Sequence, residues 1–312
     1  MKIYNNIHDF RHVKCPVVTV GTFDGVHLGH QQIIARLNQV AHEKGGESVV
    51  VTFDPHPRMV LTPNDKAVRL INIAKRKYEH LQKAGVQHLI VLPFTLEFAK
   101  TPWQDFIKEV IVDQIQAAHL VIGYDHRFGA HRQGSHDSMI EMAKLYGFGV
   151  EEVDEFLIDG VQVSSTRIRQ ALNGGFIREA NRLLGYEYSI TGLVVHGNRI
   201  GHQLGFPTAN IETDDKFKLI AANGVYASRV EWNGNVYDGM SNIGIRPTIN
   251  DLRFAVEVNI FDFDKDIYGE CLTVYFIDRI RDEVRFATLE ELSKQLAVDK
   301  LKVKQLLKEK RL

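Results

Sequence analysis

The chain is 312 residues long, with 44% hydrophobic and 25% charged residues and a formal net charge of −1. This near-neutral balance is not that of a protein built to coat nucleic acid or an acidic membrane, although local basic pockets remain compatible with it. The only cysteines, Cys15 and Cys271, form no C-x-x-C pair and so give no sign of a disulfide framework or a thiolate zinc site. Without a signal-like segment or a run of 18 apolar residues, we expect a cytoplasmic protein with no membrane or nucleic-acid partner.

The first half of the chain alternates strand and helix patterns. Short apolar, β-branched runs predict strands at 16–23, 48–53, 88–94 and 119–123. A helix is expected after the first of these, and others at 101–115, with Thr101 as N-cap and Pro102 as first residue, and at 135–146. Apolar strands alternating with helices predict a parallel sheet covered on both faces, whose ligands bind at the carboxyl ends of the strands.

The pattern changes near Gly185, where helical periodicity stops and short strands follow one another. Asn233-Gly234 separates two such strands, as in a hairpin with a two-residue turn. Alternating runs predict further strands at 254–261 and 271–277. Many short strands with turn signals predict an antiparallel barrel or sandwich.

The tail is helical again, and Thr288 and Glu291 have the spacing of a capping box at its start. The change of pattern places a domain boundary at 184/185. We therefore expect an α/β domain at 1–184 and a β domain with a terminal helix at 185–312.

The first candidate site follows the first predicted strand, where GTFDGVHLGH (21–30) leads through glycines into a helix. His27 and His30 lie near the helix N-terminus, where backbone N–H groups and the helix dipole favour phosphates. Two imidazoles there can donate hydrogen bonds to a phosphoryl group under attack. The alternatives are a tight turn with two solvated histidines and a zinc site, although no third zinc ligand lies at motif spacing.

A second anion site is indicated by VSSTRIR (163–169), where Ser164 or Ser165 can cap the helix that carries Arg167. Alone, this segment is typical of many surface helices. Paired with H-x-G-H after the first strand, it resembles the signature of the nucleotidylyltransferase superfamily, which transfers a nucleoside monophosphate from a triphosphate. TFDPHP (52–57) and GYDHRFG (123–129) follow two other strands and would reach the same rim.

The second half carries a different candidate site. Thr208 and Asn210 lie two residues apart within PTAN and would face the same way in an extended segment. A hydroxyl and an amide carbonyl are hard oxygen ligands suited to magnesium together with phosphate oxygens, whereas local turn chemistry is the alternative. Glu257, a lone carboxylate in an alternating apolar strand, is either solvent-facing or a functional base.

Taken together, these segments resemble the bifunctional riboflavin kinase/FMN adenylyltransferase family from about residue 15 to the C-terminus. NGVYA, NIGIRPT, VEVNIFDFDKDIYG and RIRDE extend the resemblance in the second half. It implies a Rossmann-like nucleotidylyltransferase domain followed by a six-stranded antiparallel Greek-key barrel with a C-terminal helix. It implies that the barrel domain phosphorylates riboflavin to FMN with ATP. It also implies that the first domain adenylylates FMN to FAD and releases pyrophosphate.

The resemblance further implies roles for individual residues. The expected catalytic residues are His27, His30, Arg167 and Glu257, the last as the base for the riboflavin 5′-hydroxyl. ATP is expected to contact Gly21, Phe23, Ser165, Thr166, Gly197 and Gly201. The flavin is expected to contact Asp54, His56, Asp125, Phe128, Arg281 and Glu283. Magnesium, which accompanies ATP, is expected at Thr208 and Asn210.

Three other functions fit parts of the pattern. A class I aminoacyl-tRNA synthetase shares H-x-G-H, but no K-M-S-K-S-like loop occurs and the net charge of −1 indicates no tRNA-binding face. A flavin-binding storage or regulatory protein could keep the fold without the reaction. The presence of the two histidines, PTAN and Glu257 is evidence against this alternative. In a single-activity enzyme only one of the two modules would work. The sequence leaves the oligomeric state open.

Overall fold

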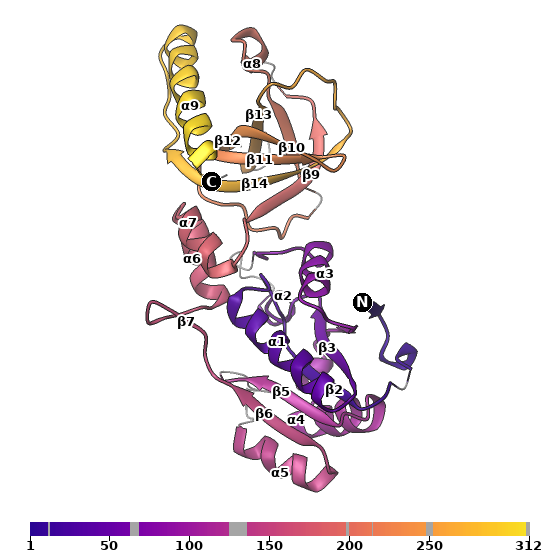
Figure 1. Cartoon of the computed structure of the whole chain (residues 1–312). Helices are drawn as coiled ribbons and strands as arrows, with labels where there is room; N and C mark the ends of the chain where they lie inside the picture. Colours follow the sequence, from indigo (N-terminus) through magenta and orange to yellow (C-terminus); the bar gives the residue numbers. More distant parts are fainter. Residues whose placement is uncertain are drawn as a thin grey trace. The chain divides into compact units, whose positions relative to one another are not determined.

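The computed structural model describes residues 1–11, 13–62, 69–124, 136–197, 200–213, 215–247 and 252–309. The chain divides into two compact units, residues 1–165 and 166–312. Figure 1 shows the first unit in indigo to pink and the barrel of the second in salmon to yellow. Each unit is described by itself.

The first unit is built on a parallel six-stranded sheet with the strand order β1-β4-β3-β2-β5-β6. Its strands are β1 (Lys2–Tyr4), β2 (Pro16–Val20), β3 (Glu47–Asp54), β4 (His88–Pro93), β5 (His119–Gly123) and β6 (Gly149–Val153). Its helical segments are η1 (Ile7–Asp9), α1 (Leu28–Glu43), α2 (Pro57–Leu61), α3 (Ala74–Lys83), η2 (Phe98–Lys100), α4 (Trp103–Phe106), the π-helical η3 (Ile107–Gln114) and α5 (His136–Tyr146). A small hairpin of β7 (Leu157–Ile158) and β8 (Val161–Gln162) follows. The predicted parallel sheet is confirmed, and β2 lies where the strand order reverses, the usual ligand position in such sheets.

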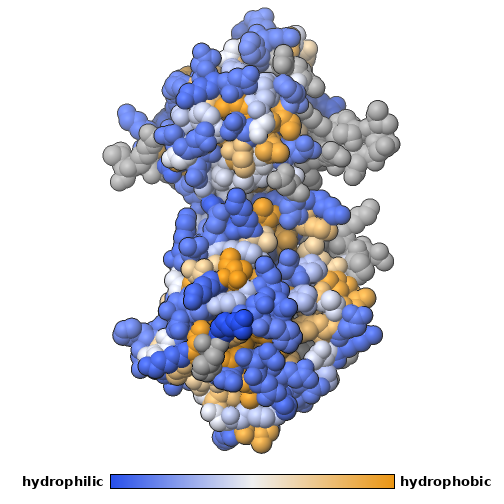
Figure 2. All heavy atoms as spheres, turned by 90° about the vertical axis from the view of Figure 1, so that its right-hand side faces the viewer, coloured by the Kyte–Doolittle hydropathy of each residue, from blue (hydrophilic) through white to orange (hydrophobic). Residues whose placement is uncertain are grey.

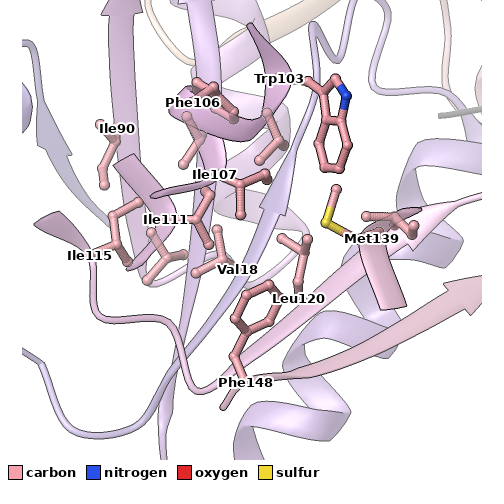
Figure 3. Close-up of a cluster of buried hydrophobic side chains, with 14 of the residues drawn as sticks. Val18, Ile90, Trp103, Phe106, Ile107, Ile111, Ile115, Leu120, Met139 and Phe148 are labelled. Atoms are coloured by element: carbon pink, nitrogen blue, oxygen red, sulfur yellow. The ribbon is translucent and has the colours of Figure 1, made fainter. Parts of the chain in front are cut away.

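Burial on both faces explains the apolar runs in the four central strands, β2, β3, β4 and β5. Successive residues of β2 point to opposite faces, so that Val17 and Val18 belong to different core clusters. Val17 packs on the face covered by α1, together with Ile34 and Leu37 of that helix. Val18 packs on the other face, in the cluster shown in Figure 3 with side chains from α4, η3 and α5.

The helix after η2 begins later than the sequence indicated. Thr101 closes η2, since its N–H donates to the carbonyl of Phe98 at 3.0 Å, and α4 begins at Trp103 without a side-chain cap. Pro102 is itself extended, with ψ at 144°, and therefore takes the cap position. The expectation of Thr101 as N-cap is wrong, because the extended proline moves the helix start one residue beyond the reach of that hydroxyl.

The second unit contains a closed antiparallel barrel with the strand order β10-β13-β12-β11-β14-β9. Its strands are β9 (Ser189–Val195), β10 (Ala209–Glu212), β11 (Gly224–Trp232), β12 (Asn235–Pro247), β13 (Leu252–Ile260) and β14 (Cys271–Arg281). Its helices are α6 (Ser165–Asn173), α7 (Ile177–Leu184), α8 (Ile200–Gln203) and α9 (Leu289–Glu309). The barrel, and not the sandwich, is therefore the architecture of this half.

Local signals in the second unit act as predicted. Asn233 and Gly234 have positive φ angles of 48° and 75°, which the two-residue turn between β11 and β12 requires. The Thr288 hydroxyl accepts the N–H of Glu291 at 3.2 Å and so caps α9. The buried face of α9 packs on the barrel through Val303 and Leu307.

The helices that precede the barrel are bonded to it. The Asn181 side chain of α7 donates to the carbonyl of Phe276 and accepts the N–H of Tyr188, both at 2.8 Å. The carbonyl of Leu172 in α6 accepts the N–H of Ala222 at 2.9 Å. The segment 166–184 therefore belongs to the compact second unit, although the sequence pattern changes only near residue 185.

In the part of the chain that the structure describes, every helix is too short or too polar to cross a membrane. Figure 2 shows one face of the molecule, on which hydrophilic residues predominate and hydrophobic ones gather in separate groups.

Candidate active sites

The loop between β2 and α1 has a backbone conformation that few residues adopt. Gly25 and Val26 have positive φ angles of 88° and 35°, and a β-branched residue there is strained unless its surroundings hold it. The buried Asp24 carboxylate supplies part of that support, since it accepts the N–H groups of Ile71 and Asn72 at 3.2 and 3.1 Å. The loop is therefore fixed before any ligand binds.

His27 and His30 meet at the N-terminus of α1, as the sequence predicted. His27 is the N-cap, since its Nδ1 accepts the N–H of His30 at 3.3 Å, and the two rings stack with centroids 3.6 Å apart. Only 5% of His27 is exposed, which rules out a pair of solvated histidines. No group of three or more metal-binding side chains occurs among the described residues, so nothing there supports zinc.

His30 is neutral at physiological pH. Burial lowers the pKa of its imidazole well below 6.5, and the nearby His27 and Lys77 lower it further. Its Nδ1 is buried and bonds to no group in the described part of the chain. A neutral imidazole with an unused ring nitrogen is suited to a hydrogen bond with a ligand.

Two residues expected to contact ATP, Gly21 and Phe23, have different surroundings. Gly21 directly follows β2, and its N–H donates to the carbonyl of Val51 at 3.0 Å. The Phe23 ring is buried and makes a T-shaped contact with the His30 ring, at a centroid distance of 5.1 Å. The Phe23 side chain therefore supports the histidine from within the core.

The predicted anion segment at 163–169 joins the loop through Ser165, whose hydroxyl donates to the carbonyl of Asp24 at 2.9 Å. Thr166 and Arg167 follow on α6. The Arg167 guanidinium pairs with Glu179 of α7 at 3.1 Å and is partly exposed. Contacts of Thr166 and Arg167 with ATP stay predictions.

A small cavity opens at the carboxyl ends of β2 and β3. It is lined by Thr22, Asp24, Phe53, Asp54, His56, Leu70, Asn72, Ala74 and Lys77. Two of the expected flavin contacts, Asp54 and His56, thus share a cavity with residues of the loop. The other two expected in this half, Asp125 and Phe128, lie outside the described residues.

Lys77 is a candidate functional residue that sequence reasoning missed. It lies on α3 with only 8% of its surface exposed, and its Nζ donates to the Thr52 hydroxyl at 3.2 Å and the carbonyl of Thr22 at 3.4 Å. Burial lowers the pKa of Lys77, an effect that the nearby Asp24 and Asp54 oppose. The one sequence signal is its spacing of four from the buried Leu81, which places both on the same helix face.

In the barrel, strand register brings three polar side chains into one row. Asn210 of β10 pairs with Glu257 of β13, which in turn pairs with Asn242 of β12. Residues directly opposite one another on paired strands point to the same face of a sheet. The Thr208 hydroxyl lies 3.5 Å from the Glu257 carboxylate and donates to it. Three predicted residues, Thr208, Asn210 and Glu257, therefore lie together.

The Asn210 side chain is placed to receive a ligand. Its Oδ1 is buried and accepts no hydrogen bond from the described residues. A Cβ at Gly197 would lie 2.2 Å from the Asn210 amide nitrogen, so a larger residue at 197 would displace the Asn210 side chain. Gly201, in α8, is similarly confined, since its Cβ would lie 2.4 Å from the carbonyl of Phe206. The orphaned carbonyl oxygen, with the neighbouring hydroxyl and carboxylate, fits the ligand preference of Mg²⁺.

Arg281 and Glu283, the expected flavin contacts of the barrel, have different surroundings. Arg281 forms a two-pronged ion pair with the buried Asp299 of α9, with distances of 2.7 and 2.9 Å to Oδ2. Glu283 lies 3.5 Å from the amide of Asn242 and so adjoins the row. Asn242 was assigned no role, although it begins NIGIRPT, one of the segments that carry the resemblance.

Known protein families match the two units in series. The model of FAD synthetase matches residues 11–167, and that of riboflavin kinase matches residues 184–307. With a parallel α/β unit and a closed barrel, these matches define a two-module transferase that makes flavin nucleotides.

Curated relatives span almost the whole chain. The bifunctional riboflavin kinase/FMN adenylyltransferase of Haemophilus influenzae is 37% identical over 301 residues, which cover 96% of this chain and 97% of the relative. That of Escherichia coli K12 is 35% identical over 305 residues, with 96% of each chain covered. A crystal structure from Streptococcus pneumoniae, named as a macrolide-efflux protein, is 33% identical with a TM-score of 0.90 and covers 97% of this chain and 98% of its own.

The chain belongs to the bifunctional riboflavin kinase/FMN adenylyltransferase family. It phosphorylates riboflavin to FMN with its C-terminal domain and adenylylates FMN to FAD with its N-terminal domain.

Proposed function

We propose that each reaction has its own set of residues. Adenylyl transfer uses the loop between β2 and α1 with His27 and His30, and riboflavin phosphorylation uses Thr208, Asn210 and Glu257. The observation that carries the proposal is that these two polar clusters share no element, since one lies at the carboxyl end of β2 and the other on β10 and β13. We further propose that the functional boundary lies at 184/185, so that 1–184 forms FAD and 185–312 forms FMN.

In adenylyl transfer, a phosphate oxygen of FMN attacks the α-phosphorus of ATP, and the bond to the pyrophosphate leaving group breaks. Negative charge grows on the oxygens around the α-phosphorus. Neutral His30, with N–H groups at the start of α1, donates hydrogen bonds to these oxygens. The donors are already in place because His27 caps the helix and Asp24 holds the loop.

Around these histidines, the remaining expected residues have binding roles. Gly21, Ser165, Thr166 and Arg167 form the ATP site, which Phe23 supports from the core behind His30. Asp54, His56, Asp125 and Phe128 form the flavin site of this half. The shared cavity of Asp54 and His56 with residues of the loop supports a flavin phosphate close to the histidines.

In riboflavin phosphorylation, the 5′-hydroxyl of riboflavin attacks the γ-phosphorus of ATP and ADP leaves. A primary hydroxyl is a weak nucleophile, so Glu257 orients it and accepts its proton. The Thr208 hydroxyl donates to the Glu257 carboxylate and so fixes its orientation. Arg281 and Glu283 contact the flavin, and Gly197 and Gly201 let the backbone approach ATP.

Magnesium fits the oxygen atoms of this row. Thr208 and Asn210 would hold the ion, with the unpaired Asn210 oxygen as the clearest vacant ligand among the described residues. When bound with ATP, it supplies positive charge to the phosphates.

The cytoplasmic location remains a prediction, which cell fractionation tests.

Two variants, each measured in both reactions, test this division. His30→Ala should lose FAD formation from supplied FMN while it still makes FMN from riboflavin. Glu257→Gln should show the opposite. Loss of both activities in either variant, with an unchanged melting temperature, would contradict two independent sites.

A further inference from the structure

The loop between β2 and α1 and the helix α3 are joined by hydrogen bonds in both directions. In one direction, the Asp24 carboxylate accepts the N–H groups of Ile71 and Asn72, which lead into α3. In the other, Lys77 of α3 returns a hydrogen bond to the carbonyl of Thr22, the residue just before the loop turns. This reciprocal pair links the helix to the segment that carries the histidines.

Lys77 also links two strand ends. Its Nζ bonds to Thr22 beyond β2 and to the Thr52 hydroxyl within β3, and these strands are neighbours in the sheet. Burying a lysine is costly unless its charge is compensated. Here Asp24 and Asp54 line the same cavity and provide that compensation. A buried ammonium retained at this point indicates a function beyond packing.

We propose that Lys77 is a positioning residue for adenylyl transfer, because its ammonium fixes the carboxyl ends of β2 and β3 and thereby the loop that presents His27 and His30. The assignment rests on the proposed role of these histidines. Lys77 needs no contact with substrate for this role, since its bonds are to the protein.

The charge of Lys77 has a second consequence for His30. Among the described residues, the His30 ring is affected by the stacked His27, the T-shaped contact with Phe23 and the positive charge of Lys77. Lys77 lowers the pKa of His30 and so helps to keep it neutral. Loss of this charge therefore raises the His30 pKa, which a purely mechanical support would not do.

Lys77→Met tests the proposal, since it removes the charge and keeps most of the chain length. The kcat of FAD formation should fall about 10²-fold, as expected for misplaced catalytic groups, with a smaller change in KM. FMN formation from riboflavin should keep its parent rate. Lys83→Met, an exposed lysine of the same helix, is the matched control and should change neither reaction.

NMR titration measures the pKa of His30, which would not change if Lys77 only supported the structure. The His30 pKa should rise in Lys77→Met and return toward the parent in Lys77→Arg, which restores the charge and part of the FAD-forming rate. Thr52→Val removes only the hydroxyl anchor, and should lower FAD formation about fivefold without moving the His30 pKa. This variant also keeps the test informative if Lys77→Met does not fold.

Parent-like FAD formation in a folded Lys77→Met protein would overturn the proposal, and if that variant does not fold, parent-like FAD formation in Thr52→Val would overturn it. So would an unchanged His30 pKa in a folded Lys77→Met protein. Failure of the histidine assignment is separately visible, because His30→Ala would then form FAD at the parent rate. If His30→Ala loses FAD formation and Lys77→Met does not, only the role of Lys77 is wrong.

Discussion

Asn210 and Glu257 occupy facing positions on β10 and β13, and the hydroxyl of Thr208, two residues before Asn210, lies 3.5 Å from the Glu257 carboxylate. The neighbours of Glu257 along its strand, Val256 and Val258, are buried in the barrel. Because side chains alternate along a strand, Glu257 points away from them. The carboxylate therefore shares a face with the two proposed magnesium ligands, where a base and a phosphate donor have to meet.

Glu257→Gln should lower FMN formation from riboflavin by ~10²–10⁴ while conversion of supplied FMN to FAD continues. The amide retains the volume of the carboxyl group but accepts a proton poorly. Rates are compared with saturating ATP and magnesium, and the melting temperature serves as the folding control. A rate within a factor of about three of the parent, less than ~1 kcal/mol of barrier, would remove Glu257 as the base and make Glu283 the next candidate.

Asn210→Ala should raise the apparent KM for ATP in FMN formation and leave FAD formation from FMN unchanged. The substitution removes the amide oxygen that no described group uses. Asn235→Ala, at an exposed position beside the β11–β12 turn, is the control and should change neither reaction. If the magnesium and ATP dependence of FMN formation stays that of the parent, the ion binds elsewhere.

Local patterns predicted most of the fold because they record burial directly. The fully buried strand β2 and the α1 face with Ile34 and Leu37 lie in the core, as their sequence patterns indicated. The Asn233-Gly234 turn and the Thr288 cap depend only on neighbours in the chain. The prediction of Thr101 as an N-cap was wrong because Thr101 instead closes η2 and the extended Pro102 takes the cap position.

The missed residues, in contrast, are defined by partners distant in the chain. Lys77 meets Thr22 and Thr52 only after β2 and β3 have paired, and a lysine in a helix otherwise indicates a solvated face. Asn242 joins Glu257 only through the register of β12 and β13. Neither register nor strand order has a signal within one sequence window. The resemblance therefore assigned no role to Lys77, and it included Asn242 only as the first residue of NIGIRPT.

His30→Ala should lower FAD formation by ~10²–10³, the usual loss for one preorganised donor, with FMN formation nearly intact. His30 is the cleaner of the two histidines to test. His27 also caps α1, so that His27→Ala should in addition cost about 1 kcal/mol of stability. FAD formation is followed from supplied FMN, and an unchanged rate in His30→Ala would place the transferred phosphate elsewhere.

Acid should destabilise the first unit in part through His30. The pKa of this imidazole is lowered from 6.5 in the folded protein, so below about pH 6.5 the unfolded chain binds more protons. The free energy of unfolding therefore decreases as the pH is lowered, by up to about 1.4 kcal/mol per pH unit for one such proton. His30→Gln lacks this proton, so its melting temperature should fall less than that of the parent between pH 7.5 and 5.5.

A second histidine with a lowered pKa, His119, does not affect this comparison. Burial also lowers the pKa of His119, but both proteins carry that histidine, so its effect cancels in the difference. If the melting temperatures of the parent and of His30→Gln fall by the same amount between pH 7.5 and 5.5, His30 is not held neutral.

The two activities should be physically separable, and the start of the fragment should determine its stability. A fragment 185–312 contains the complete barrel and α9, and should fold and form FMN but not FAD. A fragment 166–312 adds α6 and α7, whose bonds to the barrel include both hydrogen bonds of Asn181 and the bond from Ala222 to Leu172. At about 1 kcal/mol for each hydrogen bond, the longer fragment should melt several degrees higher.

Asn181→Ala in fragment 166–312 separates this effect from a general benefit of length. It removes the bonds to Phe276 and Tyr188 and should bring the melting temperature of the longer fragment part of the way down to that of 185–312. Both fragments should phosphorylate riboflavin at similar rates, because the row of Asn210 and Glu257 lies within the barrel of each. Equal melting temperatures of the two fragments would show that α6 and α7 contribute nothing to the barrel. An unfolded circular dichroism spectrum for 185–312 beside a folded 166–312 would instead make these helices a required part of the kinase domain, and 184/185 would be the wrong boundary.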